Sequence, residues 1–350
     1  MITIDLMLTE LLERARSGSG LSKQECIRLL DFDEYSLEAL LIRATAKDLT
    51  RERMGNAGVI LGQIGIDVAP CRGGCGFCVF GEGHTRFQPF RIGNEEMDKK
   101  LHELTDYGDL YGLYLMTMHD YDRDLLFGAV ERAKKIAPPQ TQLWVNIGDT
   151  DYNTFAELKK AGVRGAYHVC RLREGTDTNL NSRDRIKTME NLLSAGLELY
   201  TCCEPIGPEH TVQELVDNFF IGIELGCTQH AVMRRIAASG TPLSAYGQIT
   251  ELRLAQICAV LTLALGKAES FKFMSIHEPN KVGLLSGANL ITAESGANPR
   301  DNNKDTKGSR GWSVPGCRKL LFDSGFTGIR QGDESIFQLN REYLMKTGSM

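Results

Sequence analysis

The chain has 350 residues, of which 42% are hydrophobic and 24% charged, with a formal net charge of -5. Charges of both signs are interspersed, which leaves no basic face for nucleic acid. No apolar run approaches the roughly 20 residues that a membrane-spanning helix needs. The ten cysteines do not suggest a secreted disulfide scaffold in a chain of this length. We therefore expect a cytoplasmic protein without a nucleic-acid or membrane partner.

The N-terminal part of the chain predicts helices. Apolar residues recur at helical spacing over residues 4–16, 22–30 and 36–52, and Ser22 stands where an N-cap is expected. We expect residues 1–54 to form an N-terminal helical extension.

The remainder, residues 55–350, alternates short apolar strands with amphipathic helices. Glycines stand where three of the helices would end, at positions 162, 196 and 226. The expected strands are 59–66, 112–118, 142–147, 165–169, 198–202, 230–234, 271–276 and 289–293. The expected helices are 122–136, 152–161, 183–195, 212–225, 249–265 and 314–324.

Eight strands alternating with helices predict an α/β fold, a complete (β/α)8 TIM-type barrel. A doubly wound open sheet is the alternative. It would usually carry a glycine-rich phosphate-binding turn after its first strand, where this chain has cysteines instead.

Cys71, Cys75 and Cys78 follow the first predicted strand on a glycine-rich loop, with the spacing CxxxCxxC. Three thiolates on such a loop can bind three irons of a [4Fe–4S] cluster and leave the fourth iron open to a small molecule. A zinc site with His84 as a fourth ligand is the alternative. The softness and spacing of the thiolates favour iron–sulfur.

This spacing, with Phe77 just before the third cysteine and at the end of a first barrel strand, resembles the signature of the radical S-adenosylmethionine (SAM) superfamily. The helical lead-in and residues 167–211 resemble its biotin-synthase-like branch, most of all the hydrogenase cofactor maturases HmdB, HcgA and HydE. The resemblance implies that SAM binds the open iron and that one electron splits it, giving a 5′-deoxyadenosyl radical that abstracts hydrogen from a small substrate. It also implies a flavodoxin- or ferredoxin-type electron donor, and places Phe77 near the adenine.

The resemblance further implies residues that position SAM. Arg185, eleven residues before Gly196, matches the arginine that contacts SAM in the family. Arg173 and Glu174 follow the fourth strand, where the family holds the ribose and methionine moiety. Thr117 stands where the family often has a Gly-Glu stretch, and Glu204 is a further candidate for SAM or substrate.

Two departures argue against biotin synthase activity itself. Trp144 and Tyr200 occupy strand positions where biotin synthase has cysteine ligands of an auxiliary [2Fe–2S] cluster. Cys202 and Cys203 are adjacent on a strand, so at most one of them readily faces the barrel interior.

The substrate candidates follow the later strands. Arginines at these strand ends would favour an anionic substrate in cofactor biosynthesis, including [Fe]-hydrogenase cofactor maturation. The alternative is that these arginines brace the rim by pairing with glutamates. A lipoyl-synthase- or methylornithine-synthase-like rearrangement enzyme, a non-catalytic iron–sulfur carrier and a zinc module are the other functions considered. The candidates are Tyr200, Arg234, Arg235, His277, Glu278, Asn280, Glu294, Asn298 and Arg300.

Overall fold

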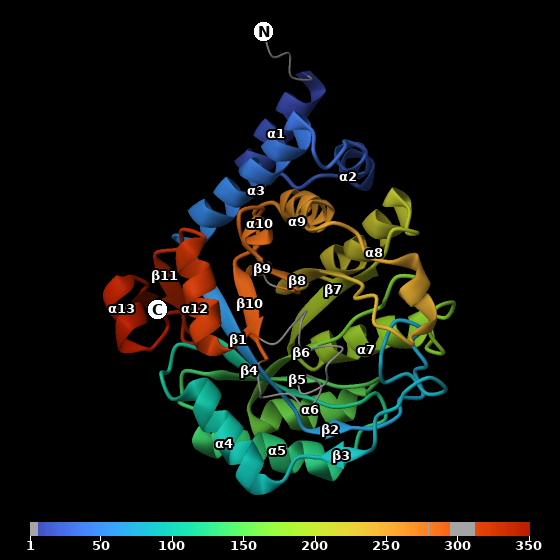
Figure 1. Cartoon of the computed structure of the whole chain (residues 1–350), viewed down its shortest axis with the longest axis vertical. Coiled ribbons are helices and arrows are strands. Elements are labelled where there is room, and N and C mark those ends of the chain that lie inside the picture. The colour runs from blue at the N-terminus through green and yellow to red at the C-terminus, as the bar shows by residue number, and fades with distance from the viewer. Residues whose placement is uncertain (1–5, 279, 295–311) are drawn as a thin grey trace.

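The computed structural model describes residues 6–278, 280–294 and 312–350 (Figure 1). Eight parallel strands form a closed barrel, because the last of them pairs with the first. This confirms the predicted (β/α)8 barrel. In barrel order the strands are β1 (Ala57–Gly65), β4 (Gly112–Met116), β5 (Gln142–Asn146), β6 (Val163–Tyr167), β7 (Glu198–Ile206), β8 (Gln229–Arg234), β9 (Phe273–Ile276) and β10 (Leu290–Ala293).

Helices cover the outside of the barrel. Three of them are followed by the predicted glycines at 162, 196 and 226, each with a positive φ. The helices are α4 (Asn94–Thr105), α5 (Arg123–Ile136), α6 (Tyr152–Ala161), α7 (Ser182–Ser194), α8 (Val212–Glu224), α9 (Glu251–Leu265), α10 (Lys281–Leu284) and α12 (Val314–Asp323). In the described part of the chain, no helix is both long and apolar enough to cross a membrane.

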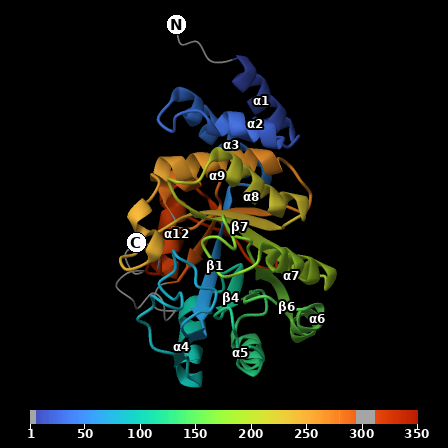
Figure 2. The ribbon, with the colours of Figure 1, turned by 90° about the vertical axis from the view of Figure 1, so that its right-hand side faces the viewer.

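The N-terminal extension is helical as predicted. It consists of α1 (Leu6–Ser17), α2 (Lys23–Leu30) and α3 (Leu37–Met54), and Ser22 caps α2 in a reciprocal capping box with Glu25. Figure 2 shows these helices lying over α9 and α8, and contacts join α3 to α9 and α2 to α8. Because α9 is buried almost throughout, the extension completes the cover on this side of the barrel.

Several elements were not predicted from the sequence. Helix α4 is the largest; its buried Met97, Leu101 and Leu104 have helical spacing, but charged residues surround them. The others are short: β2 (Asp67–Val68), β3 (Phe90–Arg91), the 3₁₀ helix η1 (Pro242–Tyr246), β11 (Gly328–Arg330), β12 (Ile336–Gln338) and α13 (Arg341–Lys346). Strand β11 pairs with the start of β1 outside the barrel.

The barrel interior is mostly aromatic. Alternate strand residues point inward, so Tyr200 and Cys202 of β7 face the interior, whereas Cys203 faces outward with its Sγ 3.9 Å from the carbonyl oxygen of Leu215 in α8. This is the alternation expected for the cysteine pair. The large interior side chains are Tyr111, Tyr114, Trp144, Tyr167, Tyr200 and Phe273. They fill the barrel below the carboxyl ends of its strands.

Candidate active site

A cavity with an empty volume of about 1100 Å³, its open mouth included, lies at the carboxyl ends of the barrel strands. This is the end at which TIM barrels build their active sites. Nine of the predicted site residues line it: Cys71, Cys75, Phe77, Cys78, Thr117, Arg185, Tyr200, Glu204 and His277. Glu294 also lines it, whereas Asn298 and Arg300 lie outside the described residues.

The cysteine loop is closed by its own backbone hydrogen bonds. The amide of Cys71 donates to the carbonyl of Phe80 at 2.8 Å, and the amide of Cys78 donates to that of Cys75 at 3.0 Å. Gly74 adopts φ +55°, which a side chain would strain. The backbone amide of Asn179 donates to the carbonyl of Gly73 at 2.8 Å, so the loop after β6 holds the cysteine loop in place.

These residues fit a cluster with three protein ligands. All three cysteines line one cavity, and Cys71 and Cys78 are half-buried while Cys75 is buried. Burial raises the pKa of Cys75 to about 12, so this thiol ionises when a metal replaces its proton. The Nε2 of His84 lies 2.7 Å from the carbonyl oxygen of Cys78 and must donate to it, so only its Nδ1 is left to bind a metal.

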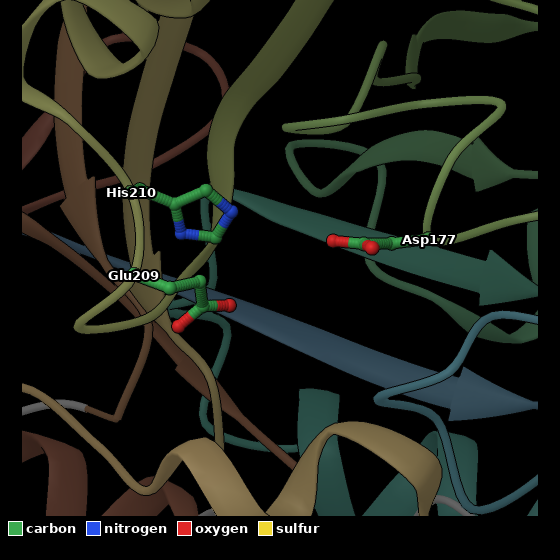
Figure 3. A group of neighbouring side chains, drawn as sticks. All are labelled: Asp177, Glu209 and His210. Carbon is green, nitrogen blue, oxygen red and sulfur yellow. The ribbon is translucent and has the colours of Figure 1, made fainter.

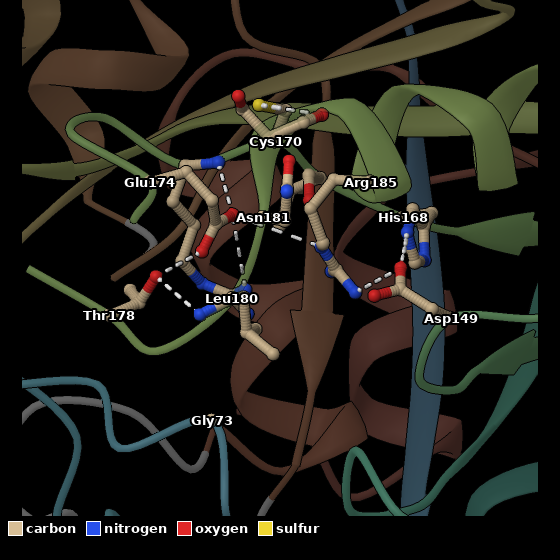
Figure 4. A network of polar contacts seen from close by, with 12 residues as sticks. Gly73, Asp149, His168, Cys170, Glu174, Thr178, Leu180, Asn181 and Arg185 are labelled. Carbon is tan, nitrogen blue, oxygen red and sulfur yellow. Dashed lines mark hydrogen bonds and ion pairs between the residues drawn. The ribbon is translucent and has the colours of Figure 1, made fainter. Parts of the chain in front are cut away.

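Arg185 lies at the centre of the network shown in Figure 4. Its Nε donates to the carbonyl of Val169 and its Nη1 to Asp149 Oδ1, both at 2.9 Å. The same carboxylate oxygen lies 3.2 Å from His168 Nε2 and accepts from Thr188 Oγ1 at 3.1 Å. These contacts hold the arginine at the cavity wall.

The pKa values of the titratable groups in this network are shifted from their ordinary values. Burial alone would raise the pKa of Asp149, but hydrogen bonding from His168 and the charge of Arg185 lower it far below its ordinary value. Burial, together with Arg185, lowers the pKa of His168 to about 3, so this ring is neutral at pH 7. Burial also lowers the pKa of His119, which lines the cavity with its Nε2 4.0 Å from Asp149.

The two polar residues predicted after β6 do not line the cavity. Arg173 points toward α8, where its Nε donates to Glu214 at 2.8 Å and its Nη2 to the carbonyl of Glu209 at 2.9 Å. Glu174 lies behind the wall and accepts from the amide of Arg171 at 2.8 Å and from Thr178 Oγ1 at 2.7 Å. Both residues shape the loop, and their contact with SAM stays a prediction that these positions do not favour.

Arg171 is the residue of this run that lines the cavity. Its Nε is buried and lies 3.3 Å from Glu204 Oε1, but the geometry is not that of a hydrogen bond. Its guanidinium carbon lies 5.9 Å from the ring centroid of Phe77. The sequence did carry a signal for it. Tyr167, Val169 and Arg171 alternate along one face, and the first two face the barrel interior.

The deep end of the cavity is built from hydrogen-bonded phenols. Tyr167 donates to Glu204 Oε2 at 2.5 Å, and the Tyr200 hydroxyl lies 3.1 Å from His277 Nε2. Tyr114 donates to Gln229 Oε1 at 3.4 Å. All three tyrosines line the cavity.

The predicted arginines at the rim are occupied. Arg234 pairs with Glu278 and donates to the carbonyl of Ile249 at 2.9 Å, and neither partner of this ion pair lines the cavity. Arg235 is buried and makes a bidentate contact with Glu209. The bracing alternative is therefore the one that the structure supports for these residues. Asn280 caps α10, accepting from the amide of Gly283 at 2.8 Å.

A second polar group lies outside this cavity. Asp177, Glu209 and His210 face one another, with ligand atoms within 4.8 Å of each other (Figure 3). Glu209 is already neutralised by Arg235. The Nδ1 of His210 accepts from the amide of Gly207 at 2.9 Å, so its Nε2 carries the proton and is not a metal ligand.

Comparisons with known proteins agree with this geometry. No protein-family profile matches the chain. It is 24% identical over 202 residues to a biotin synthase of Endomicrobium trichonymphae, a match that covers 52% of this chain and 57% of that protein. The chain thus matches little more than half the length of this curated relative.

Solved structures share the fold over nearly the whole chain. Methylornithine synthase (PylB) superposes with a TM-score of 0.77 at 15% identity, covering 96% of this chain and 99% of that one. HydG, a maturase of the [FeFe]-hydrogenase, superposes with a TM-score of 0.76 at 15% identity, covering 91% of this chain and 75% of its own. HydG from Carboxydothermus hydrogenoformans gives 0.72 at 15% identity, covering 92% of this chain and 79% of that one.

Three observations agree with one another: the spacing of the cysteines, their place after the first barrel strand, and the match to a biotin synthase. They support the predicted resemblance to the biotin-synthase-like branch of the radical SAM superfamily.

Proposed function

We propose that this chain is an enzyme that cleaves SAM reductively and uses the resulting radical to abstract hydrogen from a small molecule. The observation that carries the proposal is the position of Cys71, Cys75 and Cys78, which line one cavity together with two arginines. When bound there, a [4Fe–4S] cluster supplies the electron that splits SAM into methionine and a 5′-deoxyadenosyl radical. A flavodoxin- or ferredoxin-type protein in the cytoplasm would deliver that electron.

The chain's own residues bind and orient SAM in this proposal. Arg171 lines the cavity beside Phe77, and its buried Nε makes no hydrogen bond to the described residues, so it suits the carboxylate of SAM. Arg185 adds a second positive charge whose position Asp149 fixes. Phe77 offers a ring face for the adenine, and Thr117 a buried hydroxyl at the same wall.

The substrate enters this proposal only as a small molecule that fits below SAM. Because Glu278 and Glu209 occupy Arg234 and Arg235, these arginines give no support to an anionic substrate. We place the reaction in cofactor biosynthesis, as the resemblance implies; HydG, which shares the fold, is a maturase of the [FeFe]-hydrogenase. Sulfur insertion from a second cluster has no support, because Trp144 and Tyr200 fill the barrel interior.

The central test is anaerobic reconstitution with iron and sulfide, followed by dithionite and SAM. We expect 5′-deoxyadenosine and methionine in equal amounts. Replacing any one of Cys71, Cys75 and Cys78 by alanine should abolish both products and lower the bound iron. An intact cluster that never cleaves SAM would instead identify an iron–sulfur carrier, and one bound zinc without colour would identify a zinc module.

SAM binding tests the arginine assignment separately. Arg171→Met should weaken SAM binding to the reconstituted protein by about 10- to 100-fold, the effect of losing a hydrogen bond to a charged group. Arg173→Met is the matched control, because Arg173 contacts Glu214 outside the cavity. Equal weakening in both variants would contradict the assignment. The cluster absorbance of each variant shows whether the cysteine loop is intact.

A further inference from the structure

Three cavity tyrosines differ in what their hydroxyl groups contact. The partner of Tyr114 is the amide of Gln229, which does not take up a proton at neutral pH. The partner of Tyr167 is the carboxyl group of Glu204, which lies 3.3 Å from Nε of Arg171.

Tyr200 alone among these three contacts a group that gives and takes protons at neutral pH. Its hydroxyl lies 3.1 Å from Nε2 of His277. Imidazole is the one side chain whose ordinary pKa lies between 5 and 8. Tyr200 is buried with 2% of its surface exposed, whereas His277 is half-buried.

We propose that Tyr200 is a hydrogen-atom donor to radicals formed in this cavity and that His277 restores its proton. The proposal rests on the proposed function, since SAM cleavage supplies the radical. A phenolic O–H bond is weaker than an alkyl C–H bond, so transfer from Tyr200 to a carbon radical runs downhill. Because the site is buried, the tyrosyl radical that forms there is shielded from solvent.

The step balances as follows. The Tyr200 O–H bond breaks homolytically, a C–H bond forms on the carbon radical, and a neutral tyrosyl radical remains. One electron and one proton then restore the phenol. The electron comes from the low-potential one-electron donor, which is dithionite in vitro, and the proton comes from His277. His277, which is half-buried, regains its proton from solvent.

The aromatic packing supports this assignment. The ring centroid of Tyr200 lies 4.9 Å from that of Tyr167 and 5.9 Å from that of Tyr114, which stacks on Trp144 at 5.5 Å. Radical character can therefore remain within a group of buried rings. The thiol of Cys202, two residues further along the strand on the same face, carries another exchangeable hydrogen in the interior.

The experiment uses SAM alone, so that no substrate competes with the protein as the hydrogen donor to the 5′-deoxyadenosyl radical. Reconstituted enzyme is exchanged into D₂O and given dithionite and SAM, and the deuterium content of 5′-deoxyadenosine is measured by mass spectrometry. We expect one deuterium in product from the native protein and from Tyr114→Phe, Tyr167→Phe and Cys202→Ala. Tyr200→Phe should lose this label while it still cleaves SAM.

A label unchanged in Tyr200→Phe, or lost instead in Cys202→Ala, would overturn the proposal. Failure to form 5′-deoxyadenosine in the native protein would count against the proposed function instead. Freeze-quench EPR of the native protein gives a reading that does not depend on a variant's folding. A tyrosyl signal that narrows when ring-deuterated tyrosine is incorporated is expected, and it should decay more slowly in His277→Gln. Absence of that signal would also contradict the proposal.

Discussion

Cavity residues are held in place by partners behind the wall. Asp149 contacts Arg185, His168 and Thr188, so one carboxylate fixes an arginine, an imidazole and a hydroxyl from two different elements. Such partners orient a binding group before the ligand arrives, which lowers the cost of ordering it. Much of the precision of this site therefore depends on residues that do not line the cavity.

His168 makes folding sensitive to acid. Its pKa is about 3 in the folded protein and about 6.5 in an unfolded chain, so the unfolded state binds the proton first as pH falls. We expect this residue to remove about 1.4 kcal/mol of stability per pH unit between about pH 6 and 4. His168→Gln, which can still donate to Asp149, should flatten the curve by that amount in urea unfolding. An identical slope in the variant would contradict the assignment.

Gly148 permits the close approach of two loops in the cavity wall. A Cβ at this position would lie 1.8 Å from the carbonyl oxygen of His119, and backbone atoms there do not yield easily. Gly148→Ala should therefore destabilise the protein by about 1–3 kcal/mol. Gly128→Ala in α5 is the control, because its Cβ meets nothing within 4 Å and should be neutral or stabilising. Unfolding curves that rank the two variants otherwise would refute this account.

The sequence singles out the candidate cluster cysteines more directly than it singles out the cavity arginines. Three cysteines in eight residues leave few alternatives, and their spacing alone identifies them. Choosing between Arg171 and Arg173 requires knowing where β6 ends. The strand ends at Tyr167 but its inward alternation continues to Arg171, and Arg173 then adopts φ +51° and turns away. Sequence patterns do not reveal such a turn at a residue other than glycine.

At the scale of elements, the barrel strands were predictable because each is a short apolar run between turn residues. Helix α4 was missed since charged residues obscure its apolar face, and β11 and β12 are too short to show a period. The division of the chain after residue 54 stays a prediction. Helix α3 packs along α9, so the extension and the barrel share contacts.

The C-terminal elements are attached through a buried ion pair. Arg318 of α12 makes a bidentate contact with Asp109, at 2.6 and 2.9 Å, and both side chains are fully buried. Tyr343 of α13 donates to the same carboxylate at 2.9 Å. One aspartate before β4 thus holds both C-terminal helices against the barrel.

Breaking this pair should be costly. Arg318→Met leaves Asp109 as a buried charge without its cation, and we expect a loss of about 3–5 kcal/mol in urea unfolding. Asp109→Leu combined with Arg318→Met should recover part of that loss, since no isolated charge remains. Lys319→Met is the control on the same helix, because its ion pair with Asp323 is exposed and contributes at most about 1 kcal/mol. Equal losses in the two single variants would show that the ion pair is not the cause.

At the scale of the whole molecule, the barrel separates a packed end from a reactive end. The lower interior is filled by aromatic rings, among them Trp144, which is fully buried. The polar groups gather at the carboxyl ends of the strands, around the cysteine loop. A radical formed at that end meets phenols and imidazole on one side and the cysteine loop on the other, with little room for water below.

This arrangement predicts one cluster per chain. This barrel has Trp144 and Tyr200 at the positions where the resemblance places the cysteine ligands of a second cluster in biotin synthase. Of the adjacent Cys202 and Cys203, only Cys202 faces inward. Reconstitution with excess iron and sulfide should therefore stop at about four irons per chain. Cys202→Ala should leave the iron content unchanged, and Cys75→Ala should reduce it to near zero. The contrary result would be two or more additional irons that persist after desalting and are lost in Cys202→Ala. It would mean that the interior opens to hold a second cluster, and sulfur insertion would again be a candidate reaction.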